Sequence, residues 1–416
     1  MAKVFPFKGW RYNEDNINLF EDVIVPPYDV ITREEQEEYY KKSPYNYIRI
    51  NLNNTIGEEK YVSAENTLNM WIGSGILVEE RKPAIYILSQ SFLVDNARVE
   101  RISCICALTL SELGDDVLAH EQTIDKHLDD RYKLMSSTSA NTGQIFMSYK
   151  DQKMTLEELH QNLKSDPSME ADLDGVYYKL WPITDTDSIN KFVVSLRDKK
   201  LVIADGHHRY KTALKYSKNH EGAQSDKVMV TLVNSENPGM QILPTHRIVK
   251  KSNIDIQEIK KKVIENFNYK EFDGVEQLLI SMEKFKTDKG FLGLFHKPSN
   301  IGFLLEFNAW ELLKNNKKEK SRALDELDTN ILHQFLLKDI FGIDTNNQKD
   351  LENLAYLRGN NSPIEMLAKE EYDVVCFVNP PSLDDVFTIA ESGEVMPQKS
   401  TYFFPKVYSG LVTRNF

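Results

Sequence analysis

Apolar residues occur along this chain in short runs that follow different periods. Residues 47–52 (YIRINL) alternate between apolar and polar positions, which predicts a half-buried strand. Residues 202–204 (VIA) form a short apolar run, which predicts a buried strand. Thr32 is followed three positions later by Glu35, and this capping-box pattern predicts that a helix begins there. Similar patterns predict strands over 84–90, 99–110, 145–147, 228–233 and 374–379, and helices over 58–72, 133–141, 151–170, 210–218 and 328–338.

The order of these elements predicts an α/β fold with one insertion. Residues 251–320 have the pattern helix, helix, strand, strand, which indicates a separate small α/β unit. A chain of 416 residues is long enough for two or three domains. We therefore expect an α/β region over 1–250, a small α/β insertion over 251–320, and a C-terminal region over 321–416 that folds back on the first.

Composition and charge exclude several classes of protein. The chain has 51 basic and 63 acidic side chains, a net charge of −12. This charge argues against a nucleic-acid partner, because phosphate neutralisation supplies most of that affinity. No apolar run approaches the roughly 18 residues of a membrane span, so we expect no membrane partner. Three cysteines, two of them as Cys104-x-Cys106, fit neither a disulfide framework nor a zinc site. We expect a soluble, cytoplasmic protein.

The segment Asp205-Gly206-His207-His208-Arg209 directly follows the predicted strand 202–204 and opens the predicted helix 210–218. Backbone N–H groups at a helix start are unpaired and attract anions. Gly206 allows close approach of the backbone to a ligand, and Arg209 has a planar fork suited to phosphate. Asp205 has the chemistry to accept a proton or hold Mg²⁺, and the two histidines can transfer protons. The pattern indicates a phosphate-binding, catalytic turn within 1–250. The alternative is that Asp205 only caps the helix.

A second polar cluster, His120-Glu121-x-Thr123 with Asp130-Arg131, lies in a stretch with few apolar residues. Its carboxylates have the chemistry of divalent-metal ligands, and Arg131 has that of an anion clamp. Adjacent residues of a strand point to opposite faces, so only one of His120 and Glu121 can face a shared site. The alternative is a solvated loop with a local ion pair.

Three shorter polar segments follow prolines: Tyr28–Asp29, Thr245–Arg247 and Lys399–Thr401. The last two carry cations and a hydroxyl group, which suit phosphate. In the first, two prolines hold a carboxylate rigidly. Each segment taken alone is more typical of an ordinary loop.

Conspicuous motifs include Val25 to Val30 (VPPYDV), Ala204 to Tyr210 (ADGHHRY), Leu243 to Arg247 (LPTHR) and Met396 to Phe403 (MPQKSTYF). With four more in the same order, they make the chain similar to a bacterial family catalogued as a domain of unknown function. Some of its members are labelled ParB-like. The chain departs from the family pattern at Gly143, where a Ser-Pro or similar pair is expected before Ile-Phe.

The Asp205–Arg209 turn also resembles the G-x-x-R segment of the ParB/sulfiredoxin superfamily, in which the turn and helix start bind nucleotide phosphates. That superfamily includes free-serine kinases. The resemblance therefore implies a ParB/sulfiredoxin-like mixed-sheet core and phosphoryl transfer involving L-serine or O-phosphoserine. We expect a kinase that phosphorylates the hydroxyl group of free L-serine, with ATP, ADP or pyrophosphate as donor and Mg²⁺ as cofactor. The alternatives are a phosphoserine phosphatase and a non-enzymatic ParB-like nucleotide-binding switch.

This expected reaction assigns a role to each candidate residue. Asp205 and Glu121 are expected to act as base or Mg²⁺ ligand, and His207 and His208 to contact the transferred group. The residues expected to bind phosphate are Gly206, Arg209, Arg131, His246, Arg247, Lys399 and Ser400. Those expected to bind the substrate are Tyr28, Asp29, His120 and Thr123.

Overall fold

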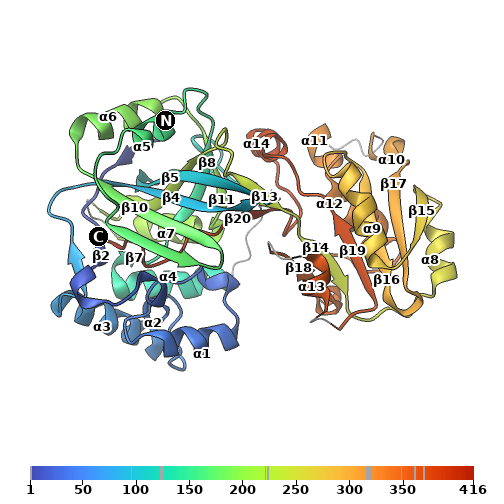
Figure 1. The fold of residues 1–416 in the computed structure, drawn as a ribbon, viewed down its shortest axis with the longest axis horizontal. Coiled ribbons are helices and arrows are strands. Elements are labelled where there is room, and N and C mark those ends of the chain that lie inside the picture. Colours follow the sequence, from blue (N-terminus) through green and yellow to red (C-terminus); the bar gives the residue numbers. More distant parts are fainter. Residues whose placement is uncertain are drawn as a thin grey trace. The chain divides into compact units, whose positions relative to one another are not determined.

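The chain divides into two compact units in a computed structural model (Figure 1). The first unit contains Met1–Ala119, Thr123–Gln241 and Pro405–Phe416, and the second contains His120–Gln122 and Ile242–Phe404. Within the described residues, no helix has the length and apolarity that crossing a membrane would need. The structure describes the whole chain except residues 1, 95, 122–125, 221, 223, 315–320, 348, 360–361 and 369–370.

The first unit is built on a nine-stranded mixed sheet, which confirms the expected α/β class. Its strand order is β6-β11-β8-β12-β5-β4-β10-β9, with β1 paired to β5. The central strand β8 runs antiparallel to β11 and parallel to β12. The strands are β1 (Val4–Phe5), β4 (Ile85–Val94), β5 (Ala97–Thr109), β6 (Val117–Leu118), β8 (Ile145–Tyr149), β9 (Met169–Leu173), β10 (Val176–Ile183), β11 (Leu201–Asp205) and β12 (Lys227–Asn234).

Helix α7 (His207–Asn219) packs directly on the core of this sheet. Its Tyr210 and Ala213 join one apolar cluster with strand residues such as Ile203 and Val230, and burial of this face stabilises the helix. Helix α4 (Lys126–Thr138) packs against both α7 and α3 (Glu59–Gly73). The other α-helices of this unit are α1 (Arg33–Lys42), α2 (Ile48–Asn51), α5 (Thr155–Gln161) and α6 (Thr186–Ser195).

The second unit is built on a six-stranded antiparallel sheet with an apolar cluster on each face. Alternate residues of β19 show this clearly, because Cys376 belongs to one cluster while Val375 and Phe377 belong to the other. Helix α8 (Ile256–Val263) covers the first face and α9 (Val275–Met282) covers the second. The strand order is β15 (Phe267–Asp273), β17 (Ile301–Phe307), β16 (Phe291–His296), β19 (Val374–Val378), β14 (His246–Val249) and β18 (Leu354–Leu357).

Short elements complete the two units. In the second unit, α12 (Asp328–Ile331) continues into a π-helix over Leu332–Lys338. Other helices are α10 (Trp310–Lys314), α11 (Arg322–Asp325), α13 (Pro363–Leu367) and α14 (Leu383–Glu391). The short strands are β2 (Trp10–Tyr12), β3 (Leu77–Glu79), β7 (Ala140–Asn141), β13 (Gln241–Leu243), β20 (Tyr402–Phe404) and β21 (Arg414–Asn415). The 3₁₀ turns are Glu14–Asn16, Phe20–Asp22, Tyr28–Val30, Glu283–Phe285, Lys297–Ser299 and Asp350–Asn353.

Several predicted elements differ from the structure. Residues 47–52 contain helix α2 rather than a strand, because Ile48, Ile50 and Asn51 are all buried and the alternation does not separate two faces. Within the predicted helix 151–170, only the residues of α5 are helical. Strand β9 begins at Met169, near the end of the predicted helix.

The capping box of Thr32 and Glu35 is present at the start of α1. The second unit is larger than the expected 251–320 insertion, because strands from β14 to β19 share one sheet. Residues 405–416 belong to the first unit.

Candidate functional site

The buried strand β11 passes into α7 through a single residue, Gly206. Gly206 is the N-cap of α7 and has φ 94°, a left-handed conformation that glycine adopts at no steric cost. A Cβ atom at this position would lie 3.0 Å from the Arg209 Nε. This geometry leaves the first amides of a 13-residue helix at the end of the strand, where they suit an anion. The N-cap of α7 is Gly206 and not Asp205, so the alternative that Asp205 only caps the helix does not hold.

Asp205 at the end of β11 pairs with two cations of the first unit. Its Oδ2 lies 3.1 Å from the Lys406 Nζ and 3.8 Å from the Arg209 Nη2. All three side chains are largely shielded from water, with exposed fractions of 17% for Asp205, 13% for Lys406 and 14% for Arg209. Burial by itself would raise the pKa of Asp205, but Lys406 and Arg209 hold that pKa well below its usual range. Asp205 is therefore ionised and pairs with both cations.

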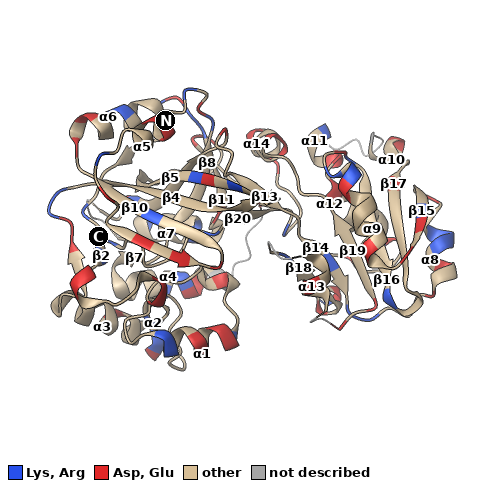
Figure 2. Ribbon diagram, in the orientation of Figure 1, with Lys and Arg blue, Asp and Glu red and all other residues tan. Residues whose placement is uncertain are grey.

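Lys406 was not among the sequence-derived candidates, and a buried clamp holds it in place. Figure 2 shows that basic and acidic residues occur in both units. Arg101 of β5 is one of the basic residues, and it is fully buried. The Arg101 Nη2 donates to the Pro405 carbonyl oxygen at 2.5 Å, and the Gln90 Nε2 donates to the Lys406 carbonyl oxygen at 3.0 Å. The Arg101 Nε also donates to the Gln90 Oε1 at 3.1 Å. Two neighbouring strands thus fix the backbone that carries the Lys406 ammonium group.

The two histidines of the turn differ in burial. His207 is buried, and it contributes to the lowered pKa of Asp205, whereas His208 is half-buried. Arg209 next to them donates from Nη1 to the Gln144 carbonyl oxygen. The guanidinium group of Arg209 therefore lies between the Asp205 carboxylate and the segment that precedes β8.

A pocket lies beside Arg209 in the first unit. Arg209 and Thr212 contribute to it from α7, and Arg131 contributes from α4. The Arg131 guanidinium lies 4.0 Å from the centre of the Tyr28 ring, a cation–π contact. Tyr28 also lines the pocket, whereas Asp29 is exposed.

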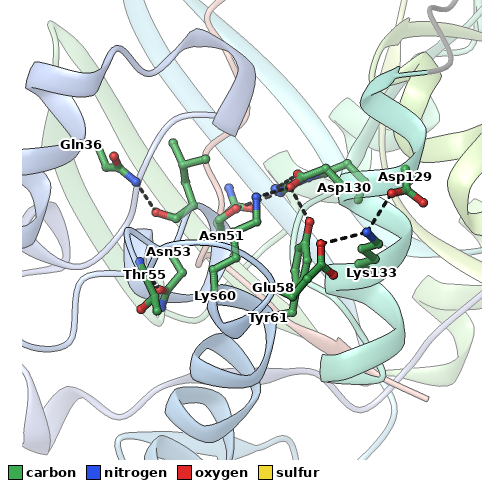
Figure 3. A network of polar contacts seen from close by, with 12 residues as sticks. Gln36, Asn51, Asn53, Thr55, Glu58, Lys60, Tyr61, Asp129, Asp130 and Lys133 are labelled. Atoms are coloured by element: carbon green, nitrogen blue, oxygen red, sulfur yellow. Dashed lines mark hydrogen bonds and ion pairs between the residues drawn. The ribbon is translucent and has the colours of Figure 1, made fainter.

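A network of polar contacts surrounds Asp130 (Figure 3). Arg131, which lines the pocket, pairs with Asp130. The Asp130 Oδ1 accepts from the Lys60 Nζ at 2.6 Å and from the Tyr61 hydroxyl at 2.9 Å. Its Oδ2 accepts from the Arg131 Nε at 2.9 Å and Nη2 at 2.5 Å. The Arg131 Nη1 donates to the Asn51 carbonyl oxygen at 2.9 Å. Burial would raise the pKa of Asp130, but Arg131 and Lys60 hold it well below its usual range.

Asp130→Asn is expected to lower the free energy of unfolding at pH 7 by about 1–3 kcal/mol, since hydrogen bonds to a charged group are lost. A carboxyl group with a lowered pKa in the folded state stabilises the protein above its unfolded pKa of about 3.9. The contribution of Asp130 is lost as the pH falls below that value, so the difference between variant and wild type should shrink. Urea unfolding at pH 7 and pH 3 measures this.

The matched control for this prediction is Asp129→Asn, one residue away on the same helix. The Asp129 side chain is 64% exposed and pairs with Lys133 at 3.0 Å. Exposed pairs of this kind contribute about 0–1 kcal/mol. Equal losses for the two variants would show that Asp130 does not anchor Arg131 as the contacts indicate.

The sequence-derived candidates of the second unit gather around the turn that contains Lys399. Lys399 has φ 58°, and its backbone N–H donates to the Glu121 Oε1 at 3.4 Å. The Arg247 Nη2 donates to the carbonyl oxygens of Gln398 and Lys399, both at 3.2 Å. The neighbouring Ser400 hydroxyl donates to the Pro397 carbonyl oxygen at 2.6 Å. Arg247, which is fully buried, therefore stabilises the conformation of this turn.

Three histidines surround this turn. The His120 Nε2 is 3.0 Å from the Thr401 hydroxyl, and the His333 Nε2 is 3.1 Å from the Arg247 Nη2. Since Arg247 can only donate, the His333 Nε2 accepts. The His246 Nδ1 accepts from the Val378 N–H at 3.2 Å. Burial, with Arg247 nearby, lowers the pKa of both His246 and His333 to about 3, so both rings are neutral at pH 7.

The family model with the description "Protein of unknown function (DUF1015)" matches residues 4–330. The chain belongs to this family. No curated protein matches it.

Solved structures with some similarity to this DUF1015 chain were also found. A free serine kinase variant in complex with ADP has a TM-score of 0.36 and 11% identity, covering 71% of this chain and 90% of that chain. A conserved hypothetical protein from Pyrococcus furiosus has a TM-score of 0.32 and 16% identity, covering 70% and 87%. SbnI with a C-terminal truncation from Staphylococcus aureus has a TM-score of 0.34 and 10% identity, covering 74% and 81%. At these TM-scores, the similarity carries no argument about function.

The two units of the DUF1015 chain divide the candidates predicted from sequence. The first unit contains Asp205, Gly206, His207, His208, Arg209, Arg131, Tyr28 and Asp29. The second contains His120, Glu121, His246, Arg247, Lys399 and Ser400. Thr123 lies outside the described residues. Among the residues that are described, no three His, Cys, Asp or Glu side chains form a metal-binding group. The expectation that both sets complete one anion pocket stays a prediction.

Proposed function

We propose that this protein is a small-molecule kinase that transfers a phosphoryl group from ATP, ADP or pyrophosphate to the hydroxyl group of free L-serine. The observation that carries the proposal is the Asp205 carboxylate, paired with Lys406 and Arg209 at the N-terminus of α7. Phosphoryl transfer needs positioning and charge neutralisation more than covalent chemistry. A carboxylate, two cations and the unpaired amides of a helix start are suited to that task.

The donor phosphates are proposed to bind the first amides of α7 together with Arg209 and Lys406. Two cations lie beside one carboxylate in this cluster, at the start of α7. Arg209 presents a planar fork that matches two phosphate oxygens, and Lys406 adds a compact charge. Gly206 lets the phosphate approach the backbone, because no Cβ atom projects there.

Asp205 is proposed to orient the serine hydroxyl group and to accept its proton. When Lys406 and Arg209 turn toward the donor phosphate, Asp205 loses part of its compensation and its proton affinity rises. The serine oxygen then forms a bond to phosphorus, the bond from phosphorus to the leaving group breaks, and the hydroxyl proton passes to Asp205. His207 and His208 are proposed to donate hydrogen bonds to the transferred group.

Asp205 is also a suitable Mg²⁺ ligand. Proteins commonly hold Mg²⁺ with one or two carboxylates and the substrate phosphates, and Asp205 is a carboxylate beside the proposed phosphate position. When bound, Mg²⁺ would neutralise phosphate charge. Glu121 remains a proposed second ligand or base.

The remaining candidates keep their proposed roles, with the exception of Arg247. Tyr28, Asp29, His120 and Thr123 are proposed to bind the substrate. In the second unit, Lys399 and Ser400 are proposed to bind phosphate together with His246. The hydrogen bonds of Arg247 to the carbonyl oxygens of this turn support a positioning role for that residue.

Phosphorus NMR of the full chain with Mg²⁺ and L-serine, in parallel with ATP, ADP or pyrophosphate, tests the proposal. A new phosphomonoester signal in one sample would support the kinase and identify its donor. If no sample reacts, O-phosphoserine alone is added. Release of inorganic phosphate would contradict the kinase and favour the phosphatase, and no reaction would favour the nucleotide-binding switch.

A further inference from the structure

Arg101 of β5 lies inside the first unit, on the face of the main sheet that is opposite α7. Its strand neighbours Ile102 and Cys104 belong to the apolar cluster that contains Tyr210 of α7. Odd and even positions of a strand point to opposite faces, so Arg101 points away from α7. Its guanidinium carbon lies 4.8 Å from the centre of the Phe146 ring. Burial lowers the pKa of Arg101 to about 9, so the side chain is charged at pH 7.

The Arg101 guanidinium group fixes the orientation of the Gln90 amide, which lies directly opposite on the neighbouring strand β4. The Arg101 Nε and Nη2 both donate to the Gln90 Oε1, at 3.1 Å and 2.5 Å. A guanidinium group can only donate, so the atom that it contacts is the amide oxygen. The amide Nε2 is therefore the atom that donates to the Lys406 carbonyl oxygen, at 3.0 Å. Arg101 thus acts on Lys406 through Gln90.

The segment that carries Lys406 is attached on both sides of this residue. Before it, the Pro405 carbonyl oxygen accepts from the same guanidinium group at 2.5 Å. After it, the Tyr408 ring lies 5.3 Å from the Tyr178 ring, and the Tyr408 hydroxyl donates to the Asp174 Oδ2. The backbone around Lys406 is therefore held in place, and the lysine side chain starts from a fixed point.

A fixed starting point matters more for lysine than for a short side chain. The lysine stem is long and flexible, so a mobile backbone would spread its ammonium group over many positions. The Lys406 ammonium group instead lies 3.1 Å from the Asp205 Oδ2, with 13% of the side chain exposed. The hydrogen bonds to the carbonyl oxygens of Pro405 and Lys406 thus reduce the conformational entropy that this ion pair costs.

We propose that Gln90 and Arg101 are positioning residues, which act through the backbone at 405–406 to hold the Lys406 ammonium group at the Asp205 carboxylate. Their effect on the place of Lys406 is independent of the reaction that the site performs. Their effect on phosphoryl transfer rests on the proposed function. A misplacement of about 1 Å can cost on the order of 10²-fold in rate, so loss of either residue should reduce turnover.

Gln90→Glu separates the two contacts of the Gln90 amide. The introduced carboxylate still accepts from Arg101 and adds an opposite charge, so we expect the melting temperature to stay within about 4 °C of wild type. It has no N–H group for the Lys406 carbonyl oxygen. We expect acetic anhydride to acetylate Lys406 of the folded full chain at least about fivefold faster than in wild type, since one hydrogen bond is lost. Mass spectrometry of peptides from the labelled chain measures the rate at each lysine.

Lys199 is the internal control, because it pairs with the buried Asp151 at 3.3 Å in the same unit. Its acetylation rate should stay within about twofold of wild type. Gln36→Glu is the matched control variant, because the Gln36 Nε2 also donates to a carbonyl oxygen, that of Leu52, at 2.7 Å. This variant should leave the rate at Lys406 unaltered.

If Gln90→Glu does not fold, Arg101→Lys replaces it. This variant keeps the buried charge but loses the planar fork, and it should raise the rate at Lys406 about threefold or more. An unchanged rate at Lys406 in a folded variant would overturn the inference. An equal rise at Lys406 and Lys199 would also overturn it, because general loosening of the unit gives that result.

Steady-state kinetics tests the effect on the reaction. Gln90→Glu is expected to lower kcat about 10- to 100-fold and to leave the serine KM within about threefold. Faster labelling of Lys406 with an unchanged kcat would overturn the positioning role. Faster labelling in the variant, with no serine phosphorylation by wild type, would contradict only the proposed function.

Discussion

Asp205→Asn is expected to lower the turnover number for serine phosphorylation by about 10²- to 10⁴-fold, the range lost with a positioned acid or base. The substitution keeps the shape of the side chain but removes its charge and its capacity to accept the hydroxyl proton. Donor affinity should stay within about tenfold of wild type, because Lys406 and Arg209 remain and no longer share a carboxylate. Steady-state kinetics with a separate measurement of donor binding checks both expectations.

Asp226→Asn is a suitable control for this experiment. Asp226 is 54% exposed and pairs with Lys227 at 2.7 Å, so its loss should leave turnover unchanged. If Asp205→Asn turns over at the wild-type rate, the proton-accepting role belongs to Glu121 or Asp29. A loss of donor affinity in place of turnover would instead indicate that Asp205 acts mainly as a Mg²⁺ ligand.

Arg209→Ala is expected to lower kcat/KM by about 10³-fold or more, since arginines that stabilise a transferring phosphoryl group contribute on that scale. The guanidinium group of Arg209 contacts both the Asp205 carboxylate and the Gln144 carbonyl oxygen. Alanine at this position loses both contacts. Arg209→Lys keeps the charge but loses the planar fork, so its activity should lie between alanine and wild type. Initial rates at several donor concentrations measure all three proteins.

The control for this prediction is Arg197→Ala, which removes an exposed arginine of the same unit. It should change neither the rate nor the melting temperature measurably. Wild-type kinetics in Arg209→Ala would remove Arg209 from the site. A melting temperature far below that of wild type would mean that the hydrogen bond to Gln144 is needed for folding, and Arg209→Lys then becomes the decisive variant.

The turn from β11 to α7 was predicted from sequence because its determinants are local. A short apolar run, one glycine and a helix start lie within a few residues, and the structure has β11, Gly206 with φ 94° and α7 in that order. The capping box at Thr32 was predicted for the same reason. By contrast, alternation over 47–52 predicted a strand wrongly, because burial in the tertiary structure surrounds Ile48 and Ile50 on more than one side.

The partners of the turn depend on contacts between distant parts of the chain. Lys406 is 201 positions from Asp205, and no local pattern around it indicates an ion pair. Its place depends on the hydrogen bonds of Arg101 and Gln90 to the backbone at 405–406. Arg131 was predicted as an anion clamp, but its anchoring by Lys60 through Asp130 links residues 70 positions apart. The spacing of residues along the sequence does not indicate which distant residues form such pairs.

The sequence by itself determined the α/β class and the order of strand, glycine and helix around residues 201–219, because both follow from local pattern. The phosphate-binding role of residues 205–209 and the expected lack of a nucleic-acid partner stay predictions. Only the tertiary structure decided which cations face Asp205, which candidates share a unit, and that a pocket with apolar walls lies beside Arg209. The physical reason is that ion pairs and pockets depend on distances in space. Those distances are set when strands and helices from remote segments pack into one core.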